Sequence, residues 1–260
     1  MKKNKFLVIF TLMVYIFLLG PLLIIIGASF SSENFLTFPP KGFSLKWFEN
    51  ILNVEMFMET LKISLGIAFL ATMVALIMGI PAAYAINRYN FKGKNVLNGI
   101  FVSPVLIPGI VLGFALLKFL MVENDFPVYL SLFIGHAIIL FPYAIRVVSS
   151  SLSNFDYSIE EAAMSLGLSK GKTFFKVVLP NIKSGVIAAF ILAFINSFNN
   201  VPLSVFLSGP GVSTLPIQML SYVEYNYDPT IAALSVVLMV FTIVLMVIVE
   251  KTLGLSYFAK

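Results

Sequence analysis

The chain has 260 residues, of which 59% are hydrophobic and only 11% are charged, with a formal net charge of +5 and no cysteine. A soluble domain carries roughly one-quarter charged residues, so this composition excludes a soluble protein and indicates an integral membrane protein. The lack of cysteine excludes disulfides, thiolate metal sites and cysteine nucleophiles, and no basic stripe interleaved with aromatics points to nucleic acid.

The first predicted element is the apolar run from Phe6 to Phe30, which follows a short basic segment. It is too long for the core of a signal peptide and lacks a small-residue cleavage site, so we expect a retained membrane span. Residues 31–59 are polar, and Trp47 and Phe48 within them suit the membrane interface. We therefore expect an external loop that lies against the membrane.

Five further spans are predicted at about 60–86, 99–121, 129–149, 184–207 and 230–249, since about twenty apolar residues cross the hydrocarbon core. Six spans put both termini on the same side. The positive-inside rule assigns the side richer in basic residues to the cytoplasm, so both termini are expected there. The basic residues of that side are Lys2, Lys3, Lys5, Arg88, Lys92, Lys94, Arg146, Lys170, Lys172, Lys176, Lys183, Lys251 and Lys260.

Prolines and glycines interrupt the third predicted span. These residues predict a helix that is kinked and suited to a moving bundle. Equally, the glycines permit another helix to pack closely. The residues concerned are Pro104, Pro108, Gly109 and Gly113.

A polar passage over residues 158–180 separates the fourth span from the fifth. Ser158 and Glu161 have the spacing of a capping box, which predicts that a helix begins there. Gly167 falls where a helix ends in a left-handed residue. Residues 173–178 are expected to form a second short helix, closed by the Leu-Pro pair that follows. The passage therefore predicts a helix-turn-helix elbow between two spans.

Residues 167–173 are similar to a phosphate-binding loop, but three residues separate the glycines where the motif needs four, and a helix rather than a strand precedes them. We therefore expect no nucleotide on this chain. The sequence also has a single histidine and neither an HExxH nor a G-x-S-x-G motif. No catalytic residue, metal ligand or cofactor is predicted.

The elbow resembles the EAA loop of the membrane-spanning permease subunits of bacterial ABC importers. Val177 stands where that family more often has isoleucine. The resemblance extends roughly over residues 60–253 and is closest to the permeases of spermidine/putrescine type. The residues that carry it, with the neighbouring glutamate assigned to the same ATPase-coupling set, are Glu160, Glu161, Ala162, Ala163, Gly167, Leu179 and Pro180.

This resemblance implies an all-α, type I importer (MetI-like) permease fold of about six transmembrane helices in the bacterial cytoplasmic membrane. It implies one transmembrane domain over 1–260, with a core at about 60–253 and a cytoplasmic coupling elbow at about 151–182. The elbow would dock on a dimer of ATPases, which bind and hydrolyse ATP, so the chain itself is not expected to be an enzyme. The other implied partners are a second permease, expected to be a different chain, and an extracytoplasmic solute-binding protein.

Polar side chains within the spans indicate a solute pathway, because hydrocarbon penalises them unless they face protein or water. Asn196, Asn199 and Asn200 have the spacing of one helix face, and His136 and Tyr143 lie seven residues apart on the fourth span. Each set either lines the pathway or bonds neighbouring helices. Polyamine permeases often carry acids near Asn199 and Asn200, so the amides leave room for another small polar solute.

Two other classes stay open on the sequence alone. An ion-coupled secondary transporter also needs polar groups in its spans, but its usual mark is a buried carboxylate, and the acids here fall in loops or at span ends. A structural membrane subunit without transport activity predicts that the elbow and the asparagines could be changed with no loss of uptake.

Overall fold

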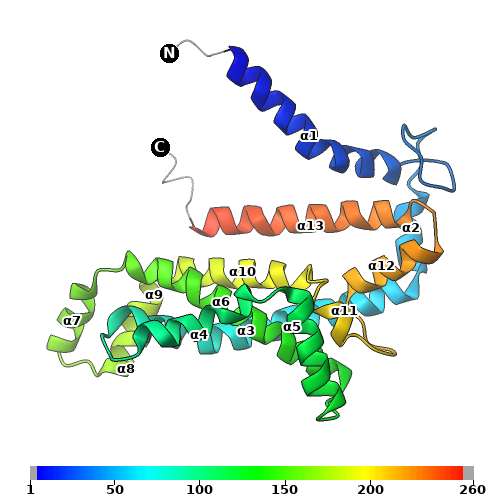
Figure 1. The fold of residues 1–260 in the computed structure, drawn as a ribbon. Helices are drawn as coiled ribbons and strands as arrows, with labels where there is room; N and C mark the ends of the chain where they lie inside the picture. Colours follow the sequence, from blue (N-terminus) through cyan, green and yellow to red (C-terminus); the bar gives the residue numbers. More distant parts are fainter. Residues whose placement is uncertain (1–4, 254–260) are drawn as a thin grey trace. The chain divides into compact units, whose positions relative to one another are not determined.

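The computed structural model describes residues 5–253, which are almost entirely helical (Figure 1). Within this range the one β-type pairing that we find is an isolated bridge between Gly209 and Val212. The predicted all-α class is confirmed. Lys2, Lys3 and Lys260, which contribute to the predicted charge asymmetry, lie outside the described residues. The elements are α1 (Lys5–Ser29), α2 (Lys46–Asn53), α3 (Glu55–Arg88), α4 (Lys94–Leu106), α5 (Gly109–Leu116), the π-helix η1 (Leu117–Val122), α6 (Val128–Ser153), α7 (Tyr157–Ser165), α8 (Lys170–Thr173), the π-helix η2 (Phe174–Val178), α9 (Leu179–Asn181), α10 (Lys183–Phe198), α11 (Ser204–Leu207), α12 (Leu215–Tyr225) and α13 (Thr230–Leu253).

Four helices in the described range are long and apolar enough to cross a membrane, namely α1, α3, α6 and α13. Two bent pairs raise the number to six if each pair counts as one span. Lys94–Leu106 and Gly109–Val122 meet at 96°, and Lys170–Asn181 meets Lys183–Phe198 at 72°. The third predicted span is therefore broken rather than merely kinked.

The break in the third span follows from proline chemistry. Ile107 precedes Pro108 and adopts an extended conformation, because the proline ring disfavours helical dihedrals at the residue before it. On the far side of the break, a Cβ on Gly113 would lie 3.1 Å from the carbonyl oxygen of Pro202. The bend and the close packing, which the sequence left as alternatives, therefore both occur.

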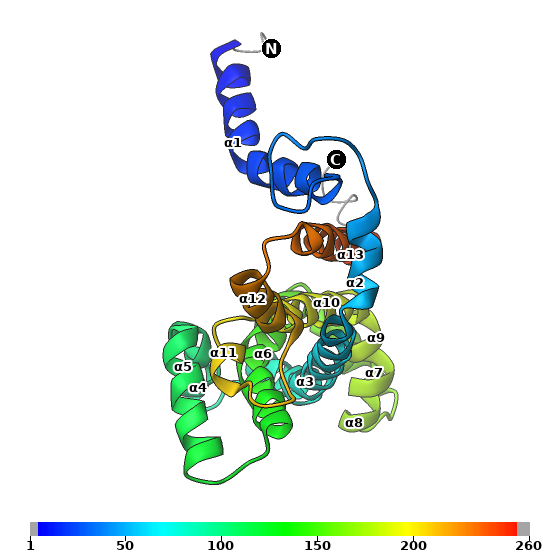
Figure 2. The same cartoon turned by 90° about the vertical axis from the view of Figure 1, so that its right-hand side faces the viewer.

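One compact unit contains residues 60–217 and 244–253 of the described range. Its core is built on α6 and α10, which lie side by side in Figures 1 and 2. Small residues bring the helices together: a Cβ on Gly79 of α3 would lie 2.8 Å from that of Ala144 of α6, and one on Gly185 of α10 would overlap Ser151. Such small residues at crossings are the usual device for packing helices inside a membrane.

The other unit contains residues 5–59 and 218–243. Trp47 of α2 is buried here, and its Nε1 donates a hydrogen bond to the carbonyl oxygen of Ser31 at 2.7 Å. Asn50 Nδ2 donates to Thr230 Oγ1 at 2.9 Å, which ties α2 to the start of α13. The indole is thus anchored inside this unit, and its position at the membrane interface stays a prediction.

Candidate coupling elbow and solute pathway

The first arm of the elbow is α7, and its start differs from the prediction. The carboxylate of Asp156 accepts a hydrogen bond from the backbone N–H of Ser158 at 2.9 Å and so caps the helix. That hydrogen bond favours the charged carboxylate and lowers the pKa of Asp156. The predicted capping box is therefore wrong: Ser158 already lies inside the helix, and Glu161 bonds elsewhere.

The end of α7 confirms the predicted stop. Gly167 has a φ of +95°, in the left-handed region that favours glycine. Its N–H donates to the carbonyl oxygen of Met164 at 3.0 Å, and the N–H of Leu168 donates to that of Ala163 at 3.2 Å. These two bonds form a Schellman motif, which satisfies the last carbonyls of the helix.

The second arm runs without interruption through α8, η2 and α9, from Lys170 to Asn181. The predicted helix at 173–178 is thus too short, and Pro180 lies within the helical run instead of ending it. The wide π turn of η2 ends at Val178, two residues before this proline, and π turns and prolines are both common where a helix departs from regular geometry. Leu179 is half-buried and Pro180 is exposed.

One arginine joins the elbow to the end of α3. The Nε of Arg88 forms an ion pair with Glu160 Oε2 at 3.1 Å, and its Nη2 donates to Glu161 Oε1 at 3.0 Å. The hydroxyl of Tyr84 donates to the other oxygen of Glu160 at 2.6 Å. The side chain of Glu160 is 3% exposed and that of Glu161 is 62% exposed. The two neighbouring glutamates therefore occupy different environments, one internal and one at the surface.

Further contacts fasten the same end of α3. Asn87 Nδ2 donates to Ser149 Oγ of α6 at 2.9 Å, and the ring of Tyr84 lies 4.9 Å from that of Phe174 of η2. Sequence reasoning missed these residues and used Arg88 only as a charge that marks the cytoplasmic side. The sequence did contain a signal for them, namely three polar residues spaced i, i+3 and i+4 at the end of an apolar helix.

The elbow exposes apolar and small residues. Leu166 is 86% exposed and Phe175 of η2 is 68% exposed. Ala162 and Gly167 are exposed, and Ala163 is half-buried. Figures 1 and 2 show α7, α8 and α9 gathered at one end of their unit. The elbow thus presents a leucine flanked by small residues, an arrangement that another protein can approach closely.

The asparagines predicted to share one helix face do not do so. Helix α10 ends at Phe198, so only the half-buried Asn196 lies on it. Asn199 is the exposed C-cap, and Asn200 Oδ1 accepts a hydrogen bond from the N–H of Leu203 at 3.0 Å. Pro202 follows, and a proline disfavours helical geometry in the residue before it, so a continued α10 would be disfavoured at Val201.

The other predicted pathway residues lie on α6. His136 is 1% exposed, and both ring nitrogens are occupied: Nδ1 lies 2.7 Å from Ser197 Oγ and Nε2 lies 3.1 Å from Ser204 Oγ. In this conformation the histidine bonds α6 to α10 and α11, while Tyr143 is half-buried. A role of either residue in the pathway stays a prediction. Sequence reasoning missed both serine partners.

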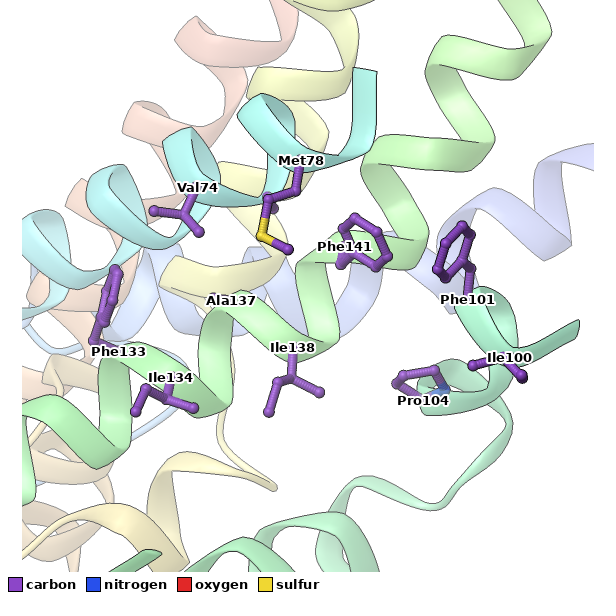
Figure 3. A pocket seen from close by; sticks show the side chains of 11 residues that line it. Val74, Met78, Ile100, Phe101, Pro104, Phe133, Ile134, Ala137, Ile138 and Phe141 are labelled. Carbon is purple, nitrogen blue, oxygen red and sulfur yellow. The ribbon is translucent and has the colours of Figure 1, made fainter. Parts of the chain in front are cut away.

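A pocket of about 390 Å³ opens between α3, α4 and α6 (Figure 3). Its lining side chains are all apolar, among them Val74, Met78, Phe101 and Phe141. They offer a polar solute no hydrogen bond, so this pocket does not fit the predicted pathway.

Comparison with known proteins gives the family. The family of binding-protein-dependent transport system inner membrane components matches residues 71–252. The chain is 32% identical over 239 residues to the spermidine/putrescine transport system permease protein PotC of Haemophilus influenzae, covering 92% of this chain and 93% of that protein. It is 31% identical over 244 residues to the putrescine transport system permease protein PotI of Escherichia coli, covering 91% and 86%.

The fold also matches a solved structure, that of a bacterial alginate ABC transporter in complex with an alginate pentasaccharide-bound periplasmic protein. The TM-score is 0.72 at 15% identity, with 95% of this chain and 91% of that chain covered. The predicted type I importer fold is thereby confirmed. By sequence over more than two-thirds of its length and by fold, the chain belongs to the family of binding-protein-dependent transport system inner membrane components and is an ABC importer permease.

Proposed function

We propose that this chain forms half of the translocation pathway of a bacterial importer and receives its driving force through the elbow, α7 to α9. Leu166 carries this proposal, because an 86% exposed leucine outside the apolar spans has no apolar surroundings unless a partner covers it. The adjacent turn at Gly167 and the exposed Ala162 leave room for a close approach. The partner that fits is a cytoplasmic ATPase with an apolar groove.

The remaining parts of the importer are proposed by analogy with the family. ATP binding and hydrolysis belong to two copies of the ATPase, and a second, different permease supplies the other half of the pathway. An extracytoplasmic binding protein delivers the solute. The basic residues around the elbow, including Lys170, Lys172 and Lys176, support a cytoplasmic location for the elbow and both termini.

The solute that we propose is a small organic cation of the polyamine type. This assignment rests on the spermidine and putrescine named for the two relatives above. Among the amides, the exposed Asn199 is the candidate contact, since a side-chain oxygen accepts hydrogen bonds from an ammonium group. Asn196 is the second candidate.

Docking of the elbow can be tested by photo-cross-linking. The sequence contains no cysteine, so Leu166→Cys provides a single thiol for a benzophenone maleimide. In membranes that also contain the ATPase, we expect a cross-linked product of the two chains. The control is Ser153→Cys, an exposed position at the end of α6. Equal cross-linking from both positions, or none from Leu166→Cys, would contradict the docking role.

The solute assignment needs a separate measurement. Proteoliposomes with the complete importer should accumulate labelled spermidine or putrescine only when ATP is enclosed with the ATPase. Uptake driven by an ion gradient without ATP would favour the secondary transporter instead. A third outcome is that the binding protein binds neither polyamine but still stimulates ATP hydrolysis by the importer. This result would contradict the proposed solute and leave the coupling role of the elbow intact.

A further inference from the structure

We propose that Arg88 is the positioning residue through which α3 follows the elbow, and this inference rests on the proposed coupling function. One guanidinium holds both neighbouring glutamates, with Nε 3.1 Å from Glu160 and Nη2 3.0 Å from Glu161. The planar fork of arginine can make both contacts at once, whereas a lysine ammonium acts as a point charge. The two contacts, an ion pair with Glu160 and a hydrogen bond with Glu161, therefore hold α7 against the end of α3 at two neighbouring points.

Burial makes the ion pair between Arg88 and Glu160 hard to break. The Glu160 side chain is 3% exposed and also accepts the hydrogen bond from Tyr84. Separating it from Arg88 would leave a carboxylate charge in surroundings that cannot hydrate it. Glu161 is 62% exposed, so water can replace its half of the contact. We therefore infer that the contact of Arg88 with Glu160 connects α3 rigidly to α7, and that water can replace its contact with Glu161.

The connection matters because α3 and α7 do not follow one another in the sequence, so only side-chain contacts join them. Helix α7 continues from α6, and the second arm of the elbow continues into α10, while α4, α5, η1 and α6 separate α3 from α7 along the chain. Helix α3 has 34 residues, which corresponds to a length of about 50 Å. A displacement of the elbow that reaches Arg88 is thus carried along a helix long enough to cross the bilayer.

The face of α3 that receives this displacement is well defined. Tyr84, Asn87 and Arg88 lie at i, i+3 and i+4 and contact the elbow or α6. The Arg88 guanidinium also lies over the ring of Tyr157, 5.1 Å from its centroid. Elbow and α3 are therefore expected to move as one body when the ATPases close.

Three substitutions in the complete importer, reconstituted with its ATPase, second permease and binding protein, test this inference. Arg88→Ala removes both contacts, Arg88→Lys keeps the charge without the fork, and Arg146→Ala removes an exposed basic residue of α6 as a matched control. Three quantities are measured for each: the cross-link from Leu166→Cys to the ATPase, the labelled spermidine taken up per ATP hydrolysed, and a distance between spin labels.

The spin labels are placed at Asn90→Cys, just beyond α3, and at Ser158→Cys on α7, both exposed. In the parent protein we expect one narrow distance distribution that is the same without nucleotide and after vanadate trapping. In Arg88→Ala we expect a broader distribution that shifts with nucleotide, together with a retained cross-link and about tenfold less uptake per ATP. Arg88→Lys should be intermediate, and Arg146→Ala should match the parent.

Two results would overturn the role of Arg88. One is an Arg88→Ala variant with parental uptake per ATP and an unchanged label distance. The other is loss of the cross-link, hydrolysis and uptake together, which would mean that Arg88 only maintains the fold. If the alanine variant fails to insert, Arg88→Gln is judged by the same criteria. Absence of the Leu166→Cys cross-link in the parent would instead reject the docking function, and the label distances would still decide the α3 connection.

Discussion

The Nδ1 atom of His136 lies 2.7 Å from the Oγ of Ser197, which joins the first half of α6 to the last turn of α10. The opposite ring nitrogen reaches Ser204 on α11, beyond the break that ends α10. The imidazole of His136 thus bridges the break between α10 and α11. Because the ring is almost fully buried, its loss leaves two hydroxyls without their partner.

Replacing His136 with alanine should therefore destabilise the protein more than it alters the chemistry of transport. An unsatisfied buried polar group costs about 1–3 kcal/mol, so we expect a clearly lower melting temperature in detergent. Uptake should fall in proportion to the amount of folded importer. Tyr143→Phe, one hydroxyl lost on the half-buried face of the same helix, is the control. A His136→Ala variant with normal stability and altered solute affinity would place the ring in the pathway instead.

A β-branched residue at Gly167 should uncouple transport from hydrolysis. The φ of +95° is strained for any residue with a Cβ, at a cost of about 1–3 kcal/mol, so Gly167→Val should reshape the turn beside Leu166. We expect normal membrane insertion, a weakened cross-link from Leu166→Cys and reduced uptake per ATP. Gly167→Asn, which tolerates left-handed geometry better, should retain more activity. Normal transport by both variants would contradict a role of the Gly167 turn in coupling.

The two asparagines beyond α10 should separate into a structural and a solute-contacting position. Asn200 holds the N–H of Leu203, so Asn200→Ala should lower stability by about 1 kcal/mol, as loss of a cap does. Asn200→Asp keeps the acceptor and should restore stability. Asn199→Leu, at an exposed position, should change the apparent affinity for spermidine without changing the melting temperature. Unchanged uptake kinetics for Asn199→Leu would remove it from the pathway.

The start of α7 should depend on pH through Asp156. Its pKa is lowered below the ordinary value of 3.8 in the folded chain, so the folded state binds fewer protons than the unfolded state in this range. The stabilisation is therefore fully present above the ordinary value and is lost as the pH falls through the lowered one. Hydrogen exchange of an α7 peptide should show this loss of protection, corrected for intrinsic rates. Asp156→Asn should remove the acid-dependent step, and an identical profile in both proteins would exclude Asp156 as its source.

Hydropathy predicted the four long apolar helices well because lipid demands long apolar segments that satisfy their own backbone. The stop at Gly167 was also predictable, since glycine favours left-handed geometry for a local steric reason. The two bends were harder. Pro108 indicated a kink, but the 96° angle depends on packing against residues near Pro202, far away in the sequence.

The candidate site was only partly predictable for the same reason. The spacing of Ser158 and Glu161 fits a capping box, but Asp156 offered a competing cap and Arg88 a stronger partner for Glu161. A periodicity argument placed Asn199 and Asn200 on a helix that ends before them. Long-range pairs such as Arg88 with Glu160 leave no signature in local spacing, so the connection between α3 and the elbow emerged only in three dimensions.

The overlap that a Cβ on Gly185 would make with Ser151 has an evolutionary consequence. The space at this crossing of α6 and α10 is shared, so enlarging one position requires shrinking the other. Related sequences that carry alanine at the position of Gly185 should therefore carry glycine at the position of Ser151. Such paired changes would reveal the contact between the two helices from sequences alone.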